Sequence, residues 1–321
     1  MQLKAIPADF IVEEESILPE QSNGPFHYFR LTKTNYDWYK VQNLLCKVFS
    51  CSPKDIGIAG IKDKNAITTQ IISIRTRKPF AVQRFKHKDI QLEYLHAGSE
   101  PIKRGFLKGN RFTLVVRGVH KKPLYRDWFI NYFDDQRFSK NNITIGLCLL
   151  KQEYEAACEL LKNETLTEFL GKRPRDYVGA LKKLPYSLLT FYAHAVQSAI
   201  FNEYVSSLLD GPTIETSIGS FHVPLKRPKD FSAPLVGFET DIDEHLQALL
   251  QRYGIKQQCF VNRQLPALTC EGGVRDAVVD VEDLQIGNLE PDELGDAQKI
   301  TLSFTLPKGC YATMFIKQLF V

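Results

Sequence analysis

The chain has 321 residues, of which 44% are hydrophobic and 24% are charged. These are ordinary proportions for a globular protein, and they exclude a disordered or fibrous chain. At roughly 150 residues per domain, this length predicts about two domains. No window approaches the ~18 consecutive apolar residues of a membrane helix. Residues 1–16 also lack the apolar core and cleavage site of a secretory signal, so we expect a cytoplasmic protein with no membrane partner.

The cysteines and histidines give no sign of a metal site. The chain has seven cysteines, an odd number, and no Cys-x-x-Cys pair. A disulfide framework and a four-cysteine zinc site are therefore not expected. The seven histidines form no His-x-His or His-x-x-x-His pair. We expect reduced, mostly buried thiols and no metal.

The net charge of +4 is unevenly distributed. Residues 1–140 contain 24 Lys and Arg against 14 Asp and Glu, whereas residues 141–321 contain 17 against 23. A basic half on a nearly neutral chain indicates a surface that faces a polyanion such as nucleic acid. A solvated, lysine-rich face would produce the same pattern.

Alternating apolar and polar residues predict strands for most of the first 120 residues. The first covers 3–15, with Phe10, Val12 and Glu14 on one face. Further strands are expected at 26–32, after the turn at 52–60, and at 68–75, 90–98 and 109–119. Asp37 is a suitable N-cap for a helix over 38–49, whose apolar residues have helical spacing.

The texture changes near residue 150, where helical patterns take over. Helices are expected within 151–163 and 187–209, and at 243–254 with Gly254 as the terminating residue. Residues 131–142 and the acidic run 290–297 are predicted to be loops. Residues 299–320 predict a strand, a turn at 307–309, and then a strand or short helix. The pattern is that of an α+β protein with a largely antiparallel sheet, in which the C-terminus returns to the first domain after an insertion.

The segment GIAGIKDKNAITTQ (57–70) is the most informative part of the chain. Gly57 and Gly60 allow the backbone to pass a tight corner beside a strand. Asp63 lies between Lys62 and Lys64, whose positive charges favour its ionised form. An ionised aspartate in a loop after a strand can act as a nucleophile or a base. It can equally be an exposed turn residue.

This segment resembles the signature of the TruD family of pseudouridine synthases. The family run Gly-x-Lys-Asp-x-x-Ala-x-Thr-x-Gln is matched from Gly60 to Gln70, with Asp63 at the position of the catalytic aspartate. Five further segments match in the family's order, so the resemblance extends nearly from end to end. They are residues 4–14, 103–117, 131–138, 187–205 and 302–319.

The resemblance implies a fold, a reaction and a partner. The fold would be a catalytic domain with a mixed, mostly antiparallel sheet (residues 1–150 and 281–321), interrupted by a family-specific α/β insertion domain (151–280). The reaction would convert uridine to pseudouridine in transfer RNA, at position 13, without a cofactor or metal. Other structured RNAs are possible substrates.

The resemblance also implies three catalytic residues. Asp63 would attack the target uridine, at C6 of the base or at C1′ of the sugar. Lys62 would flank this nucleophile. Lys4, from the N-terminal segment, would be the charge that pairs with Asp63.

Five residues would contact the substrate by the same resemblance. A flipped base needs aromatic faces to stack on and polar groups at its edge. The implied contacts are Phe10, Glu14, Asn131, Phe133 and Tyr311. From the residues alone, the aromatic ones could instead belong to the core, and Asn131 could be a loop cap.

Two departures from the family pattern fall in residues 131–139, where Asp134 and Ser139 replace glycines. Glycine permits positive φ more readily than either, so we expect an altered loop backbone. Arg137, in the same segment, could bind phosphate or brace the loop.

Two rival functions remain. One is a catalytically silent RNA-binding or RNA-folding protein on the same scaffold, against which the intact Lys62–Asp63 pair argues. The other is an RNA methyltransferase, against which the lack of a Gly-x-Gly-x-Gly loop opening a helix argues.

Overall fold

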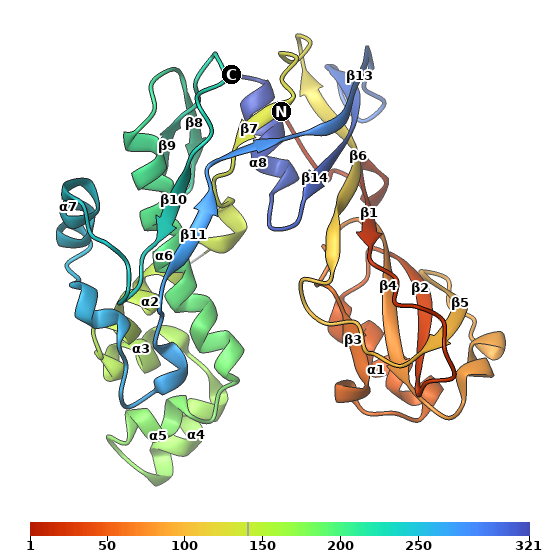
Figure 1. Ribbon diagram of the computed structural model, residues 1–321, viewed down its shortest axis with the longest axis horizontal. Helices are drawn as coiled ribbons and strands as arrows, with labels where there is room; N and C mark the ends of the chain where they lie inside the picture. The colour runs from red at the N-terminus through yellow and green to blue at the C-terminus, as the bar shows by residue number, and fades with distance from the viewer. Residues whose placement is uncertain (140) are drawn as a thin grey trace. The chain divides into compact units, whose positions relative to one another are not determined.

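The computed structural model describes residues 1–139 and 141–321, which form two compact units (Figure 1). Unit 1 comprises Met1–Asp127 and Asp280–Ala312, and unit 2 comprises Trp128–Val279 and Thr313–Val321. Both units are therefore built from two separate stretches of chain. The division into a catalytic domain and an insertion domain at 151–280 stays a prediction.

Unit 1 is built on an eight-stranded sheet with the order β13-β14-β6-β1-β4-β2-β5, and β3 also pairs with β4. β1 and β4 run parallel, and the other neighbouring pairs are antiparallel. The predicted mixed, mostly antiparallel sheet is thus confirmed. The elements are η1 (Pro7–Asp9), β1 (Phe10–Ser16), β2 (Phe26–Thr34), α1 (Trp38–Phe49), η2 (Pro53–Asp55), β3 (Ile56–Ile58), β4 (Ile67–Arg75), η3 (Pro79–Arg84), β5 (Ile90–Gly98), β6 (Leu107–Val119), β13 (Glu282–Pro291) and β14 (Gln298–Pro307).

The edge of β4 is shared between two strands. β1 pairs with residues 67–69 of β4, and β3 pairs with residues 72–74. The loop 59–66 connects β3 to β4. Since Ile67, the first residue of β4, pairs with Ile11, the loop lies beside the start of β1. Gly57 is needed here, because a Cβ on it would lie 2.3 Å from the carbonyl oxygen of Ile102. At Gly60 a Cβ would meet nothing within 4 Å. The expectation that Gly60 is needed at a tight corner is therefore wrong.

Helix α1 covers one face of this sheet. Asp37 caps it as predicted, accepting hydrogen bonds from the backbone N–H groups of Tyr39 and Lys40. The apolar stripe of the helix packs against β2, β3 and β4. This core contains Phe29, Leu31, Trp38, Val41, Leu45, Phe49, Ile56, Ile72, Ile74 and Ile90.

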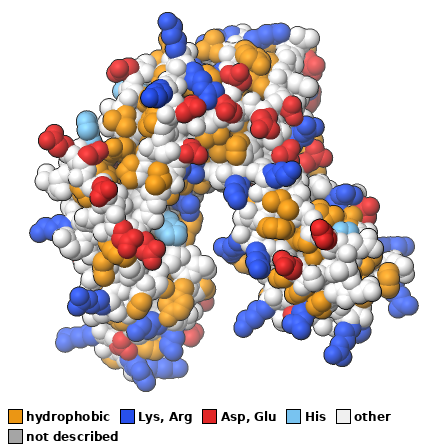
Figure 2. Space-filling model, viewed as in Figure 1, with side chains coloured by type: hydrophobic (Ala, Val, Ile, Leu, Met, Phe, Trp, Pro, Cys, Tyr) orange, Lys and Arg blue, Asp and Glu red, His pale blue; other side chains and the backbone are white. Residues whose placement is uncertain are grey.

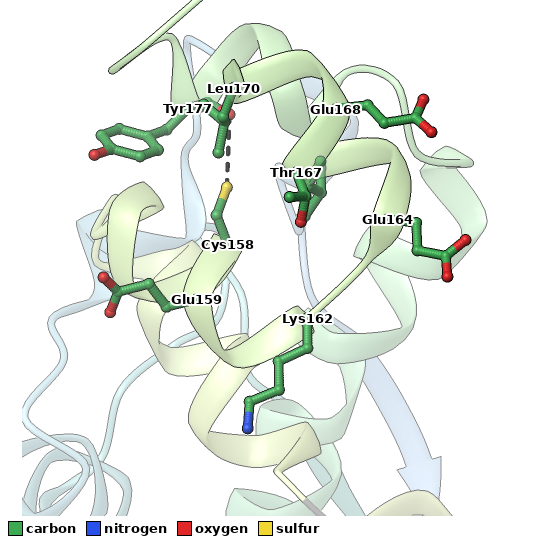
Figure 3. A pocket seen from close by; sticks show the side chains of 9 residues that line it. Cys158, Glu159, Lys162, Glu164, Thr167, Glu168, Leu170 and Tyr177 are labelled. Carbon is green, nitrogen blue, oxygen red and sulfur yellow. Dashed lines mark hydrogen bonds between the residues drawn. The ribbon is translucent and has the colours of Figure 1, made fainter.

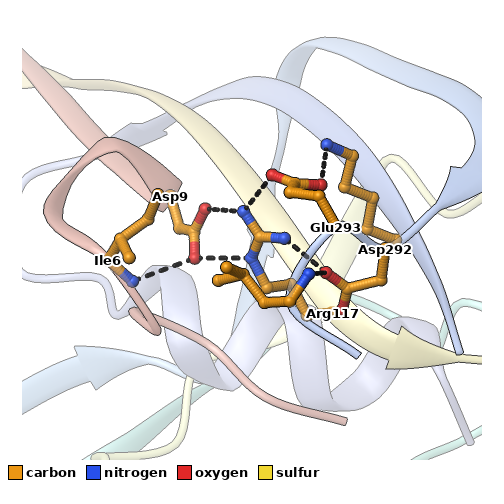
Figure 4. A network of polar contacts seen from close by, with 7 residues as sticks. Ile6, Asp9, Arg117, Asp292 and Glu293 are labelled. Carbon is orange, nitrogen blue, oxygen red and sulfur yellow. Dashed lines mark hydrogen bonds and ion pairs between the residues drawn. The ribbon is translucent and has the colours of Figure 1, made fainter. Parts of the chain in front are cut away.

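Arg117 departs from the expected alternation of β6, because it is buried although it lies opposite the apolar face (Figure 4). Its guanidinium binds Asp9 at 2.8 and 2.9 Å, and it also contacts Asp292 and Glu293. Residues 292 and 293 belong to the acidic run for which the sequence predicts a loop. The run does turn there, but two of its carboxylates neutralise a buried arginine.

Unit 2 is mainly helical. Its elements are β7 (Trp128–Ile130), η4 (Asp135–Arg137), α2 (Asn142–Leu150), α3 (Tyr154–Leu161), α4 (Glu164–Lys172), α5 (Tyr177–Leu181), α6 (Tyr186–Ser207), β8 (Thr213–Thr216), β9 (Gly219–His222), β10 (Ser232–Leu235), α7 (Glu244–Arg252), η5 (Gln257–Phe260), η6 (Pro266–Leu268), β11 (Gly273–Asp276), β12 (Val278–Asp280) and α8 (Ala312–Leu319). The expected helices near 151–163, 187–209 and 243–254 are confirmed. Helix α2 was not predicted, because its sequence NITIGLCLL is apolar on all sides and shows no helical period.

Helix α6 forms the centre of unit 2. Twelve of its residues are buried, including Ala193, Val196, Ile200 and Asn202. A helix that is buried on most of its circumference needs partners on several sides. It packs against α2, α7 and β10, and its Asn202 side chain makes two hydrogen bonds to the loop 131–134. No helix among the described residues is long and apolar enough to cross a membrane.

Candidate active site

The predicted site residues are divided between the two units. Unit 1 contains Lys4, Phe10, Glu14, Lys62, Asp63 and Tyr311, and unit 2 contains Asn131 and Phe133.

Four hydrogen bonds hold the backbone of the loop that contains Asp63. Gln70 Nε2 donates to the carbonyl of Gly60, and Lys33 Nζ donates to the carbonyl of Asp63 itself. The N–H of Asn35 donates to Ala66, and that of Gly105 donates to Ala59. The path of the loop is thus fixed at both ends and in the middle. Such anchoring reduces the motion of the Asp63 side chain, which is partly exposed.

The carboxylate of Asp63 pairs with Lys4. Its Oδ2 lies 3.2 Å from Lys4 Nζ, and 36% of the Asp63 side chain is exposed. Lys4 adopts the left-handed conformation with φ of 59°, which is unusual for a residue with a side chain. The backbone of Gln2, which exchanges two hydrogen bonds with Arg117, fixes the segment just before it. Strain of this kind persists where the surroundings determine it, and it is frequent at functional sites.

Phe10 lies beneath Lys4. Its ring is 2% exposed and stands edge-on to Phe112, with ring centroids 6.1 Å apart. The ammonium of Lys4 lies 4.0 Å from the centre of the Phe10 ring, which is within the range of a cation–π contact. Phe10 is thus both a core aromatic and the support on which the cation next to Asp63 rests.

Lys62 and Glu14 pair with each other inside the sheet. Lys62 Nζ lies 2.7 Å from Glu14 Oε2 and donates to Asn110 Oδ1 at 2.6 Å. The two side chains of the pair are only 7% and 1% exposed. Ser16 Oγ donates to the other oxygen of Glu14 at 2.6 Å. The structure therefore joins these two predicted residues, as a buried ion pair next to the Asp63 loop.

In unit 2, Arg275 holds Asn131. The guanidinium donates to Asn131 Oδ1 at 2.6 Å and to its backbone carbonyl at 3.1 and 3.2 Å. The Asn131 amide also donates to the carbonyl of Asp276 at 3.1 Å. This side chain is 4% exposed and ties the loop 131–134 to strand β11.

Phe133 lines a pocket of about 500 Å³ whose wall includes Arg137, Arg275 and the acidic Glu271. Arg275 lies 4.2 Å from the centre of its ring, and Arg137 lies 5.5 Å away. Asn202 exchanges hydrogen bonds of 2.8 and 2.9 Å with the backbone of Phe133. A pocket with an aromatic ring and two guanidinium groups suits a base next to a phosphate.

Tyr311 is half-buried and lies between the turn at 307–309 and α8. Asp134, which replaces a family glycine, has φ of −82° and ψ of 160°, so the positive φ that glycine would allow is not used there. Its side chain is buried, which raises the pKa of the carboxyl, although the Lys317 charge opposes the rise.

Sequence reasoning missed two residues of these clusters. Lys33 is 1% exposed, and burial lowers the pKa of its ammonium to about 8, although the charges of Asp63 and Asp37 oppose that shift. Lys33 alternates with polar neighbours in TKT, a pattern that also fits a solvated strand. Arg275 lies 144 residues from Asn131, and no local pattern joins them.

A further hollow in unit 2 contains none of the predicted residues (Figure 3). It measures about 620 Å³ and lies among α3, α4 and α5. Burial raises the pKa of the Cys158 thiol to about 11, so the thiol is protonated at neutral pH. Figure 3 shows the Glu164 and Glu168 carboxylates pointing away from the Cys158 thiol. Among the residues described, no three His, Cys, Asp or Glu side chains come together in a group that could hold a metal ion.

The fold is shared with a solved protein. The chain superimposes with a TM-score of 0.71 and 23% identity on the crystal structure of a Methanosarcina mazei protein described as a tRNA pseudouridine synthase D (TruD). The superposition covers 99% of this chain and 93% of that one. The two proteins therefore share one fold.

The family model for tRNA pseudouridine synthase D (TruD) matches residues 1–168, 160–220 and 226–319. The chain belongs to this family of isomerases, which act on tRNA. It is 29% identical to the probable tRNA pseudouridine synthase D 2 of Methanocaldococcus jannaschii, over 100% of this chain and 92% of the relative. It is 27% identical to the tRNA pseudouridine synthase D of Leptospira interrogans, over 99% of this chain and 95% of the relative.

Proposed function

We propose that this pseudouridine synthase acts on uridine 13 of tRNA and that Asp63 is its nucleophile. Asp63 attacks the flipped uridine at C6 of the base or at C1′ of the sugar. The bond between N1 and C1′ breaks, the base turns, and C5 bonds to C1′. The C5 proton then leaves, N1 takes up a proton, and the Asp63 carboxylate is released, so that the net change is an isomerisation.

The observation that carries this proposal is the Lys4–Asp63 pair in the anchored loop. The carboxylate is partly exposed, so a substrate can reach it, and the ion pair with the neighbouring ammonium holds it in position. The backbone of the loop is fixed by Lys33, Asn35 and Gln70. A nucleophile needs this combination of access, charge and fixed position.

The pocket beside Phe133 supports the assignment of the substrate. A base inside an RNA helix cannot be reached, so it must leave the stack and lie against another ring. Phe133 offers a ring, and Arg137 offers a charge for an adjacent phosphate. We propose that Asn131, held by Arg275, reads the edge of the uracil through its amide, and that Tyr311 and Phe10 complete the aromatic contacts. No metal or cofactor enters this scheme.

The test is single-turnover conversion of unmodified tRNA, with pseudouridine mapped at single-nucleotide resolution. Asp63→Asn keeps the size of the side chain, and we expect it to bind tRNA and to form no product at position 13. Lys4→Met should lower the rate by about 10²-fold and Lys4→Arg by less, because electrostatic support of this kind contributes several kcal/mol. Product formed by Asp63→Asn would disprove the nucleophile.

The rival proposal, a silent RNA-binding protein, is separated by the same assay. It expects tRNA binding by the wild type with no pseudouridine formed at any position. Product at a position other than 13 would keep the chemistry and change the target.

A further inference from the structure

A second basic surface lies in unit 1, on the side where α1 and η3 pack together. We propose that the groove between α1 and η3 binds the phosphate backbone of the tRNA away from the target uridine. This inference rests on the proposed function, because it assigns a second contact to the same substrate. We call this surface the η3 groove. It is lined by Leu44, Val48, Arg77, Lys78, Pro79, Phe80, Ala81, Gln83, Arg84, Phe85, Lys86 and His87.

The η3 groove lies in a strongly basic segment of the chain. Residues 75–88, RTRKPFAVQRFKHK, contain six Lys and Arg and no Asp or Glu. Of these cations, Arg77, Lys78, Arg84 and Lys86 line the groove, and all four are exposed. No salt bridge within the described part of the chain involves any of the four. Cations gathered without acidic partners attract a polyanion.

The shape of the η3 groove also supports the proposal. The groove has a volume of about 790 Å³. Its floor is fixed, since Ala81, Val82 and Phe85 pack into the core beneath α1. The cations therefore project from a rigid support, which lowers the entropy lost on binding.

The η3 groove also contains an exposed aromatic ring. Phe80 is 61% exposed, which is unusual for a residue of its size, and its ring lies 5.7 Å from that of Tyr94. An aromatic side chain among unpaired cations is typical of surfaces that bind unstacked nucleotides. A protein partner with an acidic segment would use the cations but would have less use for this ring.

Contacts connect the η3 groove to the loop that contains Asp63. The ring of His87, at the end of the groove, lies edge-on to Tyr36 with centroids 5.1 Å apart. The neighbouring Asn35 donates its N–H to Ala66, the last residue of the loop that contains Asp63. The N–H of Thr34 in turn donates to the carbonyl of Asp89. A strand of RNA that leaves the candidate nucleophile can thus follow Tyr36 and His87 into the η3 groove.

Figure 2 shows Lys and Arg side chains around much of the outer edge of the part of unit 1 formed by α1, β3 and β5, with few acidic side chains among them. The pattern agrees with the basic balance of residues 1–140. The groove gives that diffuse charge a defined location.

The test compares two variants with the same change in net charge. The groove variant carries Arg77→Gln, Lys78→Gln, Arg84→Gln and Lys86→Gln. The control variant carries Lys121→Gln, Lys122→Gln, Lys226→Gln and Lys229→Gln, which are exposed positions outside the groove. The dissociation constant for unmodified tRNA is measured by fluorescence anisotropy between 50 and 300 mM KCl.

We expect the groove variant to bind tRNA at least tenfold more weakly at physiological salt. The slope of log K against log salt should become shallower by about 3, because each lost phosphate contact removes roughly 0.7 to 0.9. The control variant should change by less than about threefold. Phe80→Ala should weaken binding about fivefold or more and Phe80→Tyr should not, since stacking contributes ~1–3 kcal/mol per base.

The outcome is independent of the nucleophile assignment. At saturating tRNA the groove variant should keep the single-turnover rate of the wild type, whereas Asp63→Asn should keep the binding and lose the rate. Equal binding and equal salt slopes for the groove and control variants would overturn the proposal. It would also be overturned if weaker binding were accompanied by a loss of folded structure in circular dichroism.

Discussion

The ammonium of Lys62 lies 2.7 Å from the carboxylate of Glu14, and both side chains are almost fully excluded from solvent. Lys62 is the chain neighbour of Asp63, but its charge is directed to β1 and to Asn110 in β6. The pair therefore links the Asp63 loop to two strands of the sheet. We propose that Lys62 positions the loop and does not touch the substrate.

Removing one partner of this buried pair should be costly. Lys62→Met leaves Glu14 charged and buried, and we expect the free energy of unfolding to fall by about 3–5 kcal/mol. The double variant Lys62→Met/Glu14→Met should regain most of that loss, because an apolar pair needs no solvation. Urea denaturation measures the free energy of unfolding of the single and of the double variant. The exposed pair of Arg111 and Asp283 is the control, and Arg111→Met should cost less than about 1 kcal/mol.

Lys33 makes the stability of the protein depend on pH. Burial lowers the pKa of this ammonium to about 8 in the folded protein, against 10.5 for the ordinary group. Between these values the unfolded chain binds more protons than the folded chain, so stability rises with pH over that range. Below pH 8 both states are protonated and the full cost of burial remains.

Lys33→Met should therefore flatten the change in stability between pH 8 and 10. The difference between wild type and variant should move by up to about 3 kcal/mol over this window, at ~1.4 kcal/mol per pKa unit. Urea denaturation at half-unit intervals of pH gives the curve. A pH dependence equal in both proteins would show that Lys33 does not titrate in this range.

The fold was predictable where one local pattern decides the structure. Phe10 and Val12 alternate with less buried residues, and Asp37 precedes a helical apolar stripe, so β1 and α1 follow from short-range chemistry. Helix α2 was missed because a segment that is apolar on all sides has no visible period. The buried Arg117 was missed because its partners Asp292 and Glu293 lie about 175 residues away.

The candidate site was predictable only in part, and through the motif more than through the residues. Asp63 and Lys4 are 59 residues apart, and nothing in either segment alone indicates that they meet at 3.2 Å. Their pairing depends on β1 and β4 running parallel, which brings residue 10 and residue 67 to the same end of the sheet. Lys33 and Arg275 belong to no quoted motif, so only the three-dimensional contacts identify them.

Arg275 should control the position of Asn131 without taking part in the reaction. Its guanidinium makes three hydrogen bonds to Asn131, so Arg275→Ala frees both the amide and the loop. We expect kcat/KM for tRNA to fall about 10- to 100-fold, and Arg275→Lys to restore little, because an ammonium cannot bridge two oxygens in the same plane. Single-turnover kinetics separate the loss in rate from the loss in binding.

The control for this prediction is Arg263→Ala, which removes an exposed arginine of the same unit. It should leave kcat/KM within about twofold of the wild type. A loss confined to folding stability, with unchanged kinetics for Arg275→Ala at low temperature, would contradict the positioning role.

The network around Arg117 should make the N-terminal segment sensitive to acid. Hydrogen bonds from Arg117 and Lys299 lower the pKa of Glu293 to about 2, against an ordinary value of 4.5. A carboxylate with a depressed pKa stabilises the fold above its ordinary value, and this contribution is lost as the pH falls towards 2. Thermal unfolding followed from pH 6 to pH 3 should therefore show Glu293→Gln to be less stable than wild type at pH 6, with the difference shrinking as the pH falls below about 4.5. Glu290→Gln, an exposed change near the end of β13 and just before the turn at Glu293, should show no such convergence. Because Arg117 also fixes Asp9 and the segment before Lys4, Arg117→Met should lower the single-turnover rate as well as the stability, whereas Glu293→Gln should lower the stability alone.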